Sequence, residues 1–263
     1  MSSMAISDAL LAVLVMPLGI TEVINNGKWV LGFRTCIVKY CLDYLLSGVP
    51  CFHVFCMALD RYIAVCHPLR YRLLSHKHAY VMICLSWMIP CLFLMSWIVI
   101  GVHEFDDCMK LTNACSLFNF KTEFIIAFVF TYVVPFFVMY FLYLLIIRKL
   151  GKIKKPLGLR MKCRISKQAD TQLCFESVVA INRNTKAFRT IGLVMICFTI
   201  CWLPSWIWLF VFLVRRSPTP SWFTVCVSWF AYLNSTLNPV LYCCNRSVRM
   251  AVRSVMCPSS VTK

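Results

Sequence analysis

Charged side chains are scarce in this sequence. Only 14% of its 263 residues are charged, while 60% are hydrophobic and the mean hydropathy is +0.76. A soluble domain of this length needs far more polar surface to face water. The scarcity of charge therefore excludes a soluble globular protein and indicates a chain embedded in a membrane.

The residue patterns of an enzyme or a zinc protein are also missing. The chain shows no nucleophile–base set and no cluster of histidines at metal-ligand spacing. Its 17 cysteines lie mostly inside apolar segments, where cysteine behaves as a small hydrophobic residue. We therefore expect neither an enzyme nor a cysteine-based zinc or disulfide scaffold.

Two further absences narrow the class of membrane protein. Inverted repeats and paired broken helices, which mark many transporters, are not found, although six spans would suit a transporter or channel. The opening Met1–Ser3 has no basic segment, and no small-residue cleavage site follows the first apolar segment. We therefore expect no cleaved signal peptide at this start.

Long apolar segments are what the sequence has in abundance. A membrane-spanning helix needs ~20 consecutive, mostly apolar residues. A short amphipathic helix is also expected over 246–255, where Val and Met alternate with Arg. The predicted fold class is an all-α transmembrane helical bundle that forms one domain over 1–263. Its six expected spans are 3–24, 34–66, 77–101, 121–149, 184–214 and 221–244.

Basic residues predict how the chain is oriented. The net charge is +17, and 20 of the 27 Lys and Arg residues lie on one set of alternating loops or after the last span. Loops rich in Lys and Arg stay in the cytoplasm, so we expect the C-terminus there, with a largely mobile basic loop over 149–184. These residues predict contact with membrane lipid headgroups rather than nucleic acid, because the aromatic residues lie in the spans and not among them.

Acidic residues inside the spans are few. A charge in a bilayer is costly enough to mark a functional position by default. Three such residues are Asp8, Asp43 and Asp60, while Glu22 stands at the outer end of its span, where we expect it to reach water.

Short motifs follow one another in a fixed order along the spans. They resemble the rhodopsin-like family of G-protein-coupled receptors. That family has seven helices, and the motifs match the second to the seventh, so the resemblance implies a receptor bundle whose first helix is missing here. In chain order the motifs are Ser7-Asp8 with Pro17, Asp60-Arg61-Tyr62, Trp87, Pro135 with Tyr143, Phe198 with Cys201-Trp202-Leu203-Pro204, Asn234-Ser235, and Asn238-Pro239-Val240-Leu241-Tyr242.

The resemblance is closest to the amine receptors. Asp43 lies seven residues after Cys36, where members that bind amines carry an aspartate that pairs with the ligand ammonium. Trp229 and Tyr232 fit the pattern of the same branch, which implies that the Tyr232 hydroxyl contacts Asp43. The run from Trp229 to Thr236 is most similar to the trace amine-associated receptors. Tyr232 also stands where light receptors carry the lysine that binds retinal, which argues against a light receptor.

The resemblance implies a ligand site around Asp43. A structural pairing of Asp43 with Lys39, one turn away, is the alternative. Thr131 offers the one hydroxyl at the places where catecholamine receptors carry serines, so we expect a small monoamine rather than a catecholamine or a diamine. Tyr232 is also expected at the ligand site. Ordinary helix packing is the alternative for each aromatic residue expected around the ammonium, namely Phe128, Phe198, Trp202, Trp206 and Trp229.

The resemblance also implies a switch at the cytoplasmic end. Arg61 would engage a heterotrimeric G protein, of the cyclic-AMP-stimulating type by analogy, and Asp60 would hold Arg61 at rest. A peptide receptor of the same fold and a truncated, non-signalling receptor fragment are the alternatives. The other expected switch residues are Tyr143, Phe198, Asn238, Pro239 and Tyr242.

Three further features follow from the resemblance. Cys36 is expected to form a disulfide with Cys115, with Cys108 as the competing partner, and Cys257 is a candidate for palmitoylation. No cofactor is expected other than a sodium ion. Its expected ligands are Asp8, Asn234, Ser235 and Asn238, although Pro50 stands where the family usually adds a hydroxyl.

Overall fold

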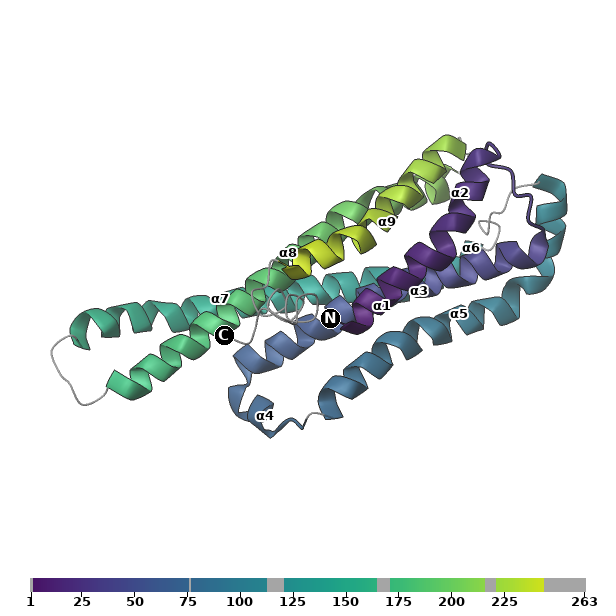
Figure 1. Cartoon of the computed structure of the whole chain (residues 1–263). Coiled ribbons are helices and arrows are strands. Elements are labelled where there is room, and N and C mark those ends of the chain that lie inside the picture. The colour runs from purple at the N-terminus through teal and green to yellow at the C-terminus, as the bar shows by residue number, and fades with distance from the viewer. Residues whose placement is uncertain (1, 76, 113–120, 165–170, 216–220, 244–263) are drawn as a thin grey trace, which may run out of the picture.

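The computed structural model describes residues 2–75, 77–112, 121–164, 171–215 and 221–243 (Figure 1). All regular structure within these ranges is helical, which confirms the predicted all-α bundle. The elements are α1 (Ser2–Leu10), η1 (Leu11–Val15), α2 (Met16–Ile24), α3 (Phe33–Cys66), α4 (Pro68–Leu73), α5 (Lys77–Thr112), α6 (Lys121–Phe128), η2 (Val129–Val133), α7 (Val134–Arg164), α8 (Thr171–Arg215) and α9 (Ser221–Cys243).

Several of these helices are long enough to cross a membrane. Within the described part of the chain, five helical stretches are long and apolar enough, by length and composition, to cross a bilayer. Helix α9, with 23 residues, corresponds to the sixth expected span. The five stretches are Ser2–Ile24, Phe33–Cys66, Lys77–Met95, Ile125–Lys152 and Thr190–Val211.

Two spans contain a π-helical turn just ahead of a proline. Proline has no N–H, so the carbonyl four residues earlier loses its helical partner. Pro17 follows η1, and Pro135 follows η2, so in both places the helix widens where that bond is lost. Each π turn contains one residue more than an α-helical turn, so it rotates the residues after it relative to those before it.

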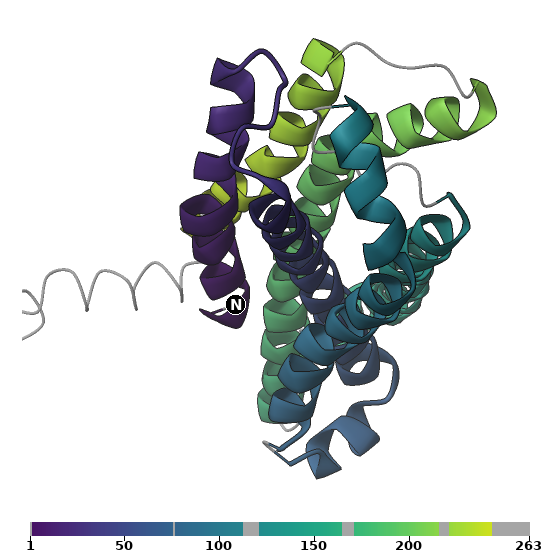
Figure 2. The ribbon, with the colours of Figure 1, turned by 90° about the vertical axis from the view of Figure 1, so that its right-hand side faces the viewer.

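Helix α3 is the central element of the bundle. It packs against α1, η1, α5, α7 and α8, and it runs through the middle of the molecule in both views (Figures 1 and 2). Helix α9 packs along α8 and also contacts α1. The buried stretch of α3 from Leu46 to Val54 is therefore enclosed by helices from both halves of the chain.

Helices α7 and α8 extend beyond the other helices at one end (left in Figure 1). They continue through most of the segment 149–184, which the sequence indicated as a largely mobile loop, and leave only 165–170 between them outside the described residues. Lys, Arg and Leu, which are frequent there, are good helix formers, so the helices persist beyond the apolar part. The expected amphipathic helix 246–255 lies outside the described residues.

Candidate ligand-binding site

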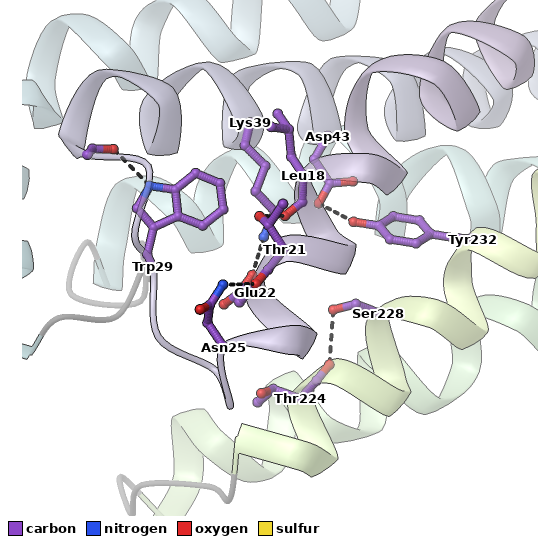
Figure 3. Close-up of polar contacts among 11 residues, drawn as sticks. Leu18, Thr21, Glu22, Asn25, Trp29, Lys39, Asp43, Thr224, Ser228 and Tyr232 are labelled. Carbon is purple, nitrogen blue, oxygen red and sulfur yellow. Dashed lines mark hydrogen bonds and ion pairs between the residues drawn. The ribbon is translucent and has the colours of Figure 1, made fainter.

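Asp43 on α3 is held by two hydroxyl groups. Tyr232 on α9 donates to Asp43 Oδ2 at 2.9 Å (Figure 3). Ser47, one turn along α3, donates to Asp43 Oδ1 at 3.3 Å. Asp43 is half-buried, whereas Tyr232 is buried. The expected contact between these two residues, which lie 189 positions apart in the sequence, is present. Because a carboxylate has about four lone-pair sites, both bonds leave Asp43 able to accept from an ammonium.

Lys39 does not pair with Asp43. Its ammonium forms an ion pair with Glu22, which reaches across from α2 (Figure 3). The side chains of Lys39 and Glu22 are only 7% and 19% exposed. The sequence had left Lys39 as the alternative partner of Asp43, whereas in the structure Lys39 pairs with Glu22.

Aromatic side chains form two groups in this part of the bundle, and one of them includes Tyr232, the partner of Asp43. Trp229 packs edge-on against Tyr232, with ring centroids 5.8 Å apart. Deeper in the bundle, Tyr132 lies 5.3 Å from Phe128 and 5.1 Å from Trp202, centroid to centroid. Trp206 and Phe198 belong to this second cluster, where Phe198 is fully buried. All the aromatic residues predicted for the site therefore lie in one of two neighbouring groups.

A hydrogen-bonded pair connects Thr131 with α3. The hydroxyl groups of Thr131 and Tyr44 are 2.5 Å apart, and Tyr44 also donates to the Ala127 carbonyl at 3.2 Å. Tyr132 donates to the Tyr44 carbonyl at 3.2 Å. Neither tyrosine was singled out in the sequence, although each stands beside a residue that was. The Thr131 hydroxyl, expected to face a ligand, is thus already engaged within the protein.

Two tryptophans bring unused donors into the aromatic cluster. Among the described residues, the indole N–H groups of Trp202 and Trp206 are buried and have no hydrogen-bond partner. A buried indole N–H usually finds a partner. Both donors are therefore unsatisfied in this structure.

At the opposite end of α3, Arg61 is held by two neighbours. Its Nε donates to Asp60 Oδ2 at 2.8 Å, and its Nη2 donates to the Tyr71 hydroxyl at 3.1 Å. Nearby, Tyr143 stacks on Phe188 with centroids 4.2 Å apart, which joins α7 to α8. The pairing of Asp60 with Arg61 was expected, whereas Tyr71 was not singled out. We call this the inner end and the end with Glu22 and Lys39 the outer end.

Comparison with known proteins agrees with this arrangement. The family model described as 7 transmembrane receptor (rhodopsin family) matches residues 1–242. The chain belongs to the rhodopsin-like receptor family. It is therefore a multi-pass membrane receptor of a family that is not enzymatic.

Several curated receptors are similar to this chain over most of its length. The trace amine-associated receptor 1 of Mus musculus is 30% identical over 91% of the chain and 72% of its own length. The 5-hydroxytryptamine receptor 4 of Homo sapiens is 30% identical over 97% of the chain and 69% of its own length. The octopamine receptor beta-2R of Chilo suppressalis is 28% identical, with shares of 97% and 69%. These relatives place the receptor in the amine branch of the family.

A buried polar cluster lies in the receptor between α1 and α9. Asn238 donates from Nδ2 to Asp8 Oδ2 at 3.0 Å. Asn234 and Ser235, which precede Asn238 on α9, are also buried. Among the described residues, three buried oxygens here have no hydrogen-bond partner: Asp8 Oδ1, Asn234 Oδ1 and Asn238 Oδ1. The structure thus joins Asp8 to Asn238, two of the four residues expected at the sodium site.

Some of the predicted residues lie outside the part of the receptor that the structure describes. Cys36 is buried and disulfide-bonded, but Cys115 lies outside the described residues, so their pairing stays a prediction. Cys257 also lies outside them, as do the side chains of Cys108, Pro239 and Tyr242.

Proposed function

We propose that this receptor binds a small monoamine at Asp43. The observation that carries the proposal is the hydrogen bond from Tyr232 to Asp43, which joins α9 to α3. A half-buried carboxylate in an apolar bundle needs a complementary cation, and Lys39 is engaged elsewhere by Glu22. Relatives of the chain are named for trace amines, octopamine and 5-hydroxytryptamine, which are all amines.

The aromatic clusters support a ligand with an apolar body. Rings near an ammonium stabilise it by roughly 0.5–2 kcal/mol each. Tyr232 donates to Asp43, and Trp229 packs edge-on against Tyr232, so aromatic rings line the approach to the carboxylate. Because the Thr131 hydroxyl is bonded to Tyr44, the site offers a catechol little in return for its two hydroxyls. A phenethylamine-like or aliphatic monoamine therefore suits the site better than dopamine.

Signalling is proposed to leave the receptor at Arg61. Its contacts with Asp60 and Tyr71 suit a resting state in which the guanidinium is not available to a partner. Opening of the inner end would release Arg61 to a heterotrimeric G protein, and we propose the cyclic-AMP-stimulating type. We also propose that the receptor acts in the plasma membrane with its C-terminus in the cytoplasm, and that Cys36 pairs with Cys115.

A sodium ion fits the buried polar cluster. Hard cations bind several oxygen ligands, and the unpartnered oxygens of Asp8, Asn234 and Asn238 supply three. The ion would offset the negative charge of Asp8. Replacing sodium with N-methylglucamine should then change amine affinity in the parent receptor and leave an Asp8→Asn variant unaffected. Equal sodium sensitivity in both proteins would refute this site.

The anchoring role of Asp43 is tested by Asp43→Asn. This change keeps the shape but removes the charge, and loss of a partner from a buried charged pair costs roughly 2–5 kcal/mol, or about 30-fold or more in potency. We expect cyclic-AMP responses to phenethylamine to shift by at least that factor at equal surface expression. Ser228→Ala is the matched control, because Ser228 is exposed on α9 and bonds only within its own helix. Unchanged potency in Asp43→Asn would contradict the proposal.

A further inference from the structure

Lys39 places a positive charge of the protein itself close to Asp43, in addition to the ammonium of a bound ligand. It lies four residues before Asp43 on α3, so the two side chains emerge on the same face one helical turn apart. A lysine and an aspartate at this spacing can pair directly. Left alone, Lys39 would therefore compete with any ligand ammonium for Asp43.

Glu22 keeps Lys39 away from Asp43. The Lys39 ammonium pairs with the Glu22 carboxylate on α2, and both side chains are largely withdrawn from water. Figure 3 shows Lys39 reaching toward Glu22 while Asp43 faces Tyr232. The pair is therefore an interhelical contact that holds one charge clear of another.

Aromatic rings hold the ammonium in this position as well. Lys39 Nζ is 5.3 Å from the ring centroids of both Trp29 and Tyr40. Trp29 is buried, and its indole N–H donates to the Gly32 carbonyl at 2.8 Å, which fixes the ring between α2 and α3. Two faces with negative π density thus reinforce the attraction of Glu22 for Lys39.

The Glu22, Lys39 and Asp43 side chains together carry a net charge of minus one, while Lys28 and Arg34 at the same end are exposed. Glu22 and Asp43 each contribute a negative charge and Lys39 a positive one, and Lys39 and Glu22 are both near enough to act on the charge of Asp43. The site therefore carries a single unbalanced negative charge, which one ammonium neutralises. A second ammonium on the same ligand would meet Lys39.

We infer that the Glu22–Lys39 ion pair sets the charge selectivity of the receptor, with Glu22 as a positioning residue that leaves Asp43 open to one ammonium and Lys39 as the group that rejects a second. This inference rests on the proposed binding of monoamines at Asp43.

The test compares phenethylamine with 1,5-diaminopentane and its longer homologues on four receptors. These are the parent, Glu22→Gln, Lys39→Met and the double variant Glu22→Gln/Lys39→Met. Cyclic-AMP potency is measured at matched surface expression, and the ratio of the two potencies is the main readout because it does not depend on how much receptor folds. Asn25→Ala is the matched control, since Asn25 lies at the same end of α2 and its side chain bonds only to the Thr21 carbonyl.

Each variant has a distinct expected result. In Glu22→Gln, Lys39 turns to Asp43, so phenethylamine potency falls about tenfold or more. In the double variant the competing cation is gone, and phenethylamine potency returns to within a few-fold of the parent. In Lys39→Met, Glu22 is an unpaired second acid, so the potency of the diamines relative to phenethylamine rises about tenfold or more. Lys39→Arg retains the charge and should keep the parent's ratio.

Two outcomes overturn the inference while leaving the proposed function intact. One is an unchanged ratio in Glu22→Gln and Lys39→Met when Asp43→Asn still abolishes the response. The other is a phenethylamine loss in Glu22→Gln that the second change, Lys39→Met, does not restore. A parent receptor that answers no amine would overturn the proposed function, and this inference with it.

Discussion

The outer and inner ends of the bundle each contain an ion pair, and the two pairs are built differently. At the outer end, Lys39 and Glu22 come from different helices, and their side chains are 7% and 19% exposed. At the inner end, Arg61 and Asp60 are adjacent on α3, with side chains 26% and 23% exposed.

The difference suits the two ends to different tasks. Breaking a buried pair strands a charge without water, whereas breaking a pair with solvent access costs little. The outer pair therefore suits a fixed wall of the ligand site. The inner pair suits a latch that opens when a partner arrives, because Asp60 stays beside Arg61 in the sequence and can re-form the contact at once.

The largest effect is expected when Lys39 loses both acids. In an Asp43→Asn background, Glu22→Gln leaves the Lys39 ammonium buried and unpaired, which costs about 3–5 kcal/mol. In the parent background the same change should cost less, because Asp43 takes over as the partner. The measurement is the thermal unfolding midpoint of the purified receptor, followed with a thiol-reactive dye, for all four members of the double-mutant cycle.

Additive effects in that cycle would argue against any competition between Glu22 and Asp43 for Lys39. A smaller loss of stability in the double variant than in Glu22→Gln alone would also argue against that competition. Only a surplus loss in the double variant agrees with a shared cation.

Sequence patterns predicted the partners of Asp43 better than those of Lys39. Tyr232 and Asp43 both stand in motifs of the amine receptors, so the resemblance alone brought them together, and their bond is present. Glu22 and Lys39 belong to no such motif. Which side of α2 faces α3 depends on the π turn before Pro17, and one inserted residue rotates the helix beyond it by about 100°.

The same reason applies to Thr131. It lies within η2, so its direction does not follow from counting 3.6 residues per turn. Its hydroxyl meets Tyr44, and this contact could not be read from the spacing to Pro135. The apolar spans and their order can be predicted from the sequence. Contacts that depend on a π turn cannot, because the sequence does not show where the turn widens.

A medium effect is expected at a close contact near the inner end. A Cβ atom added at Gly192 on α8 would lie 2.1 Å from the Tyr143 hydroxyl and 2.8 Å from its Cζ. Gly192→Ala should displace Tyr143 from its stack on Phe188 and cost about 1–3 kcal/mol, as overpacking does. Gly151→Ala on α7 is the control, because nothing lies within 4 Å of a Cβ there.

The unfolding midpoints of the two alanine variants provide the comparison for this contact. Gly192→Ala should unfold several degrees below the parent, and Gly151→Ala should match or exceed the parent, since alanine favours a helix. Equal midpoints would mean that Tyr143 has room to move, and the inner end would then be looser than its packing indicates.

The smallest effect on stability is expected for the inner ion pair. Asp60→Asn removes the charge that holds Arg61, but Arg61 keeps water and the Tyr71 hydroxyl as partners, so the loss should stay below about 1 kcal/mol. Its effect on signalling should be larger than its effect on stability, because a latch that holds weakly opens more often. Basal cyclic AMP without ligand should therefore rise in Asp60→Asn, and rise further when Tyr71→Phe removes the second contact. A fall in the unfolding midpoint as large as that of the outer double variant, with basal cyclic AMP unchanged, would show that both ion pairs serve as structural braces and that the contrast between the two ends is wrong.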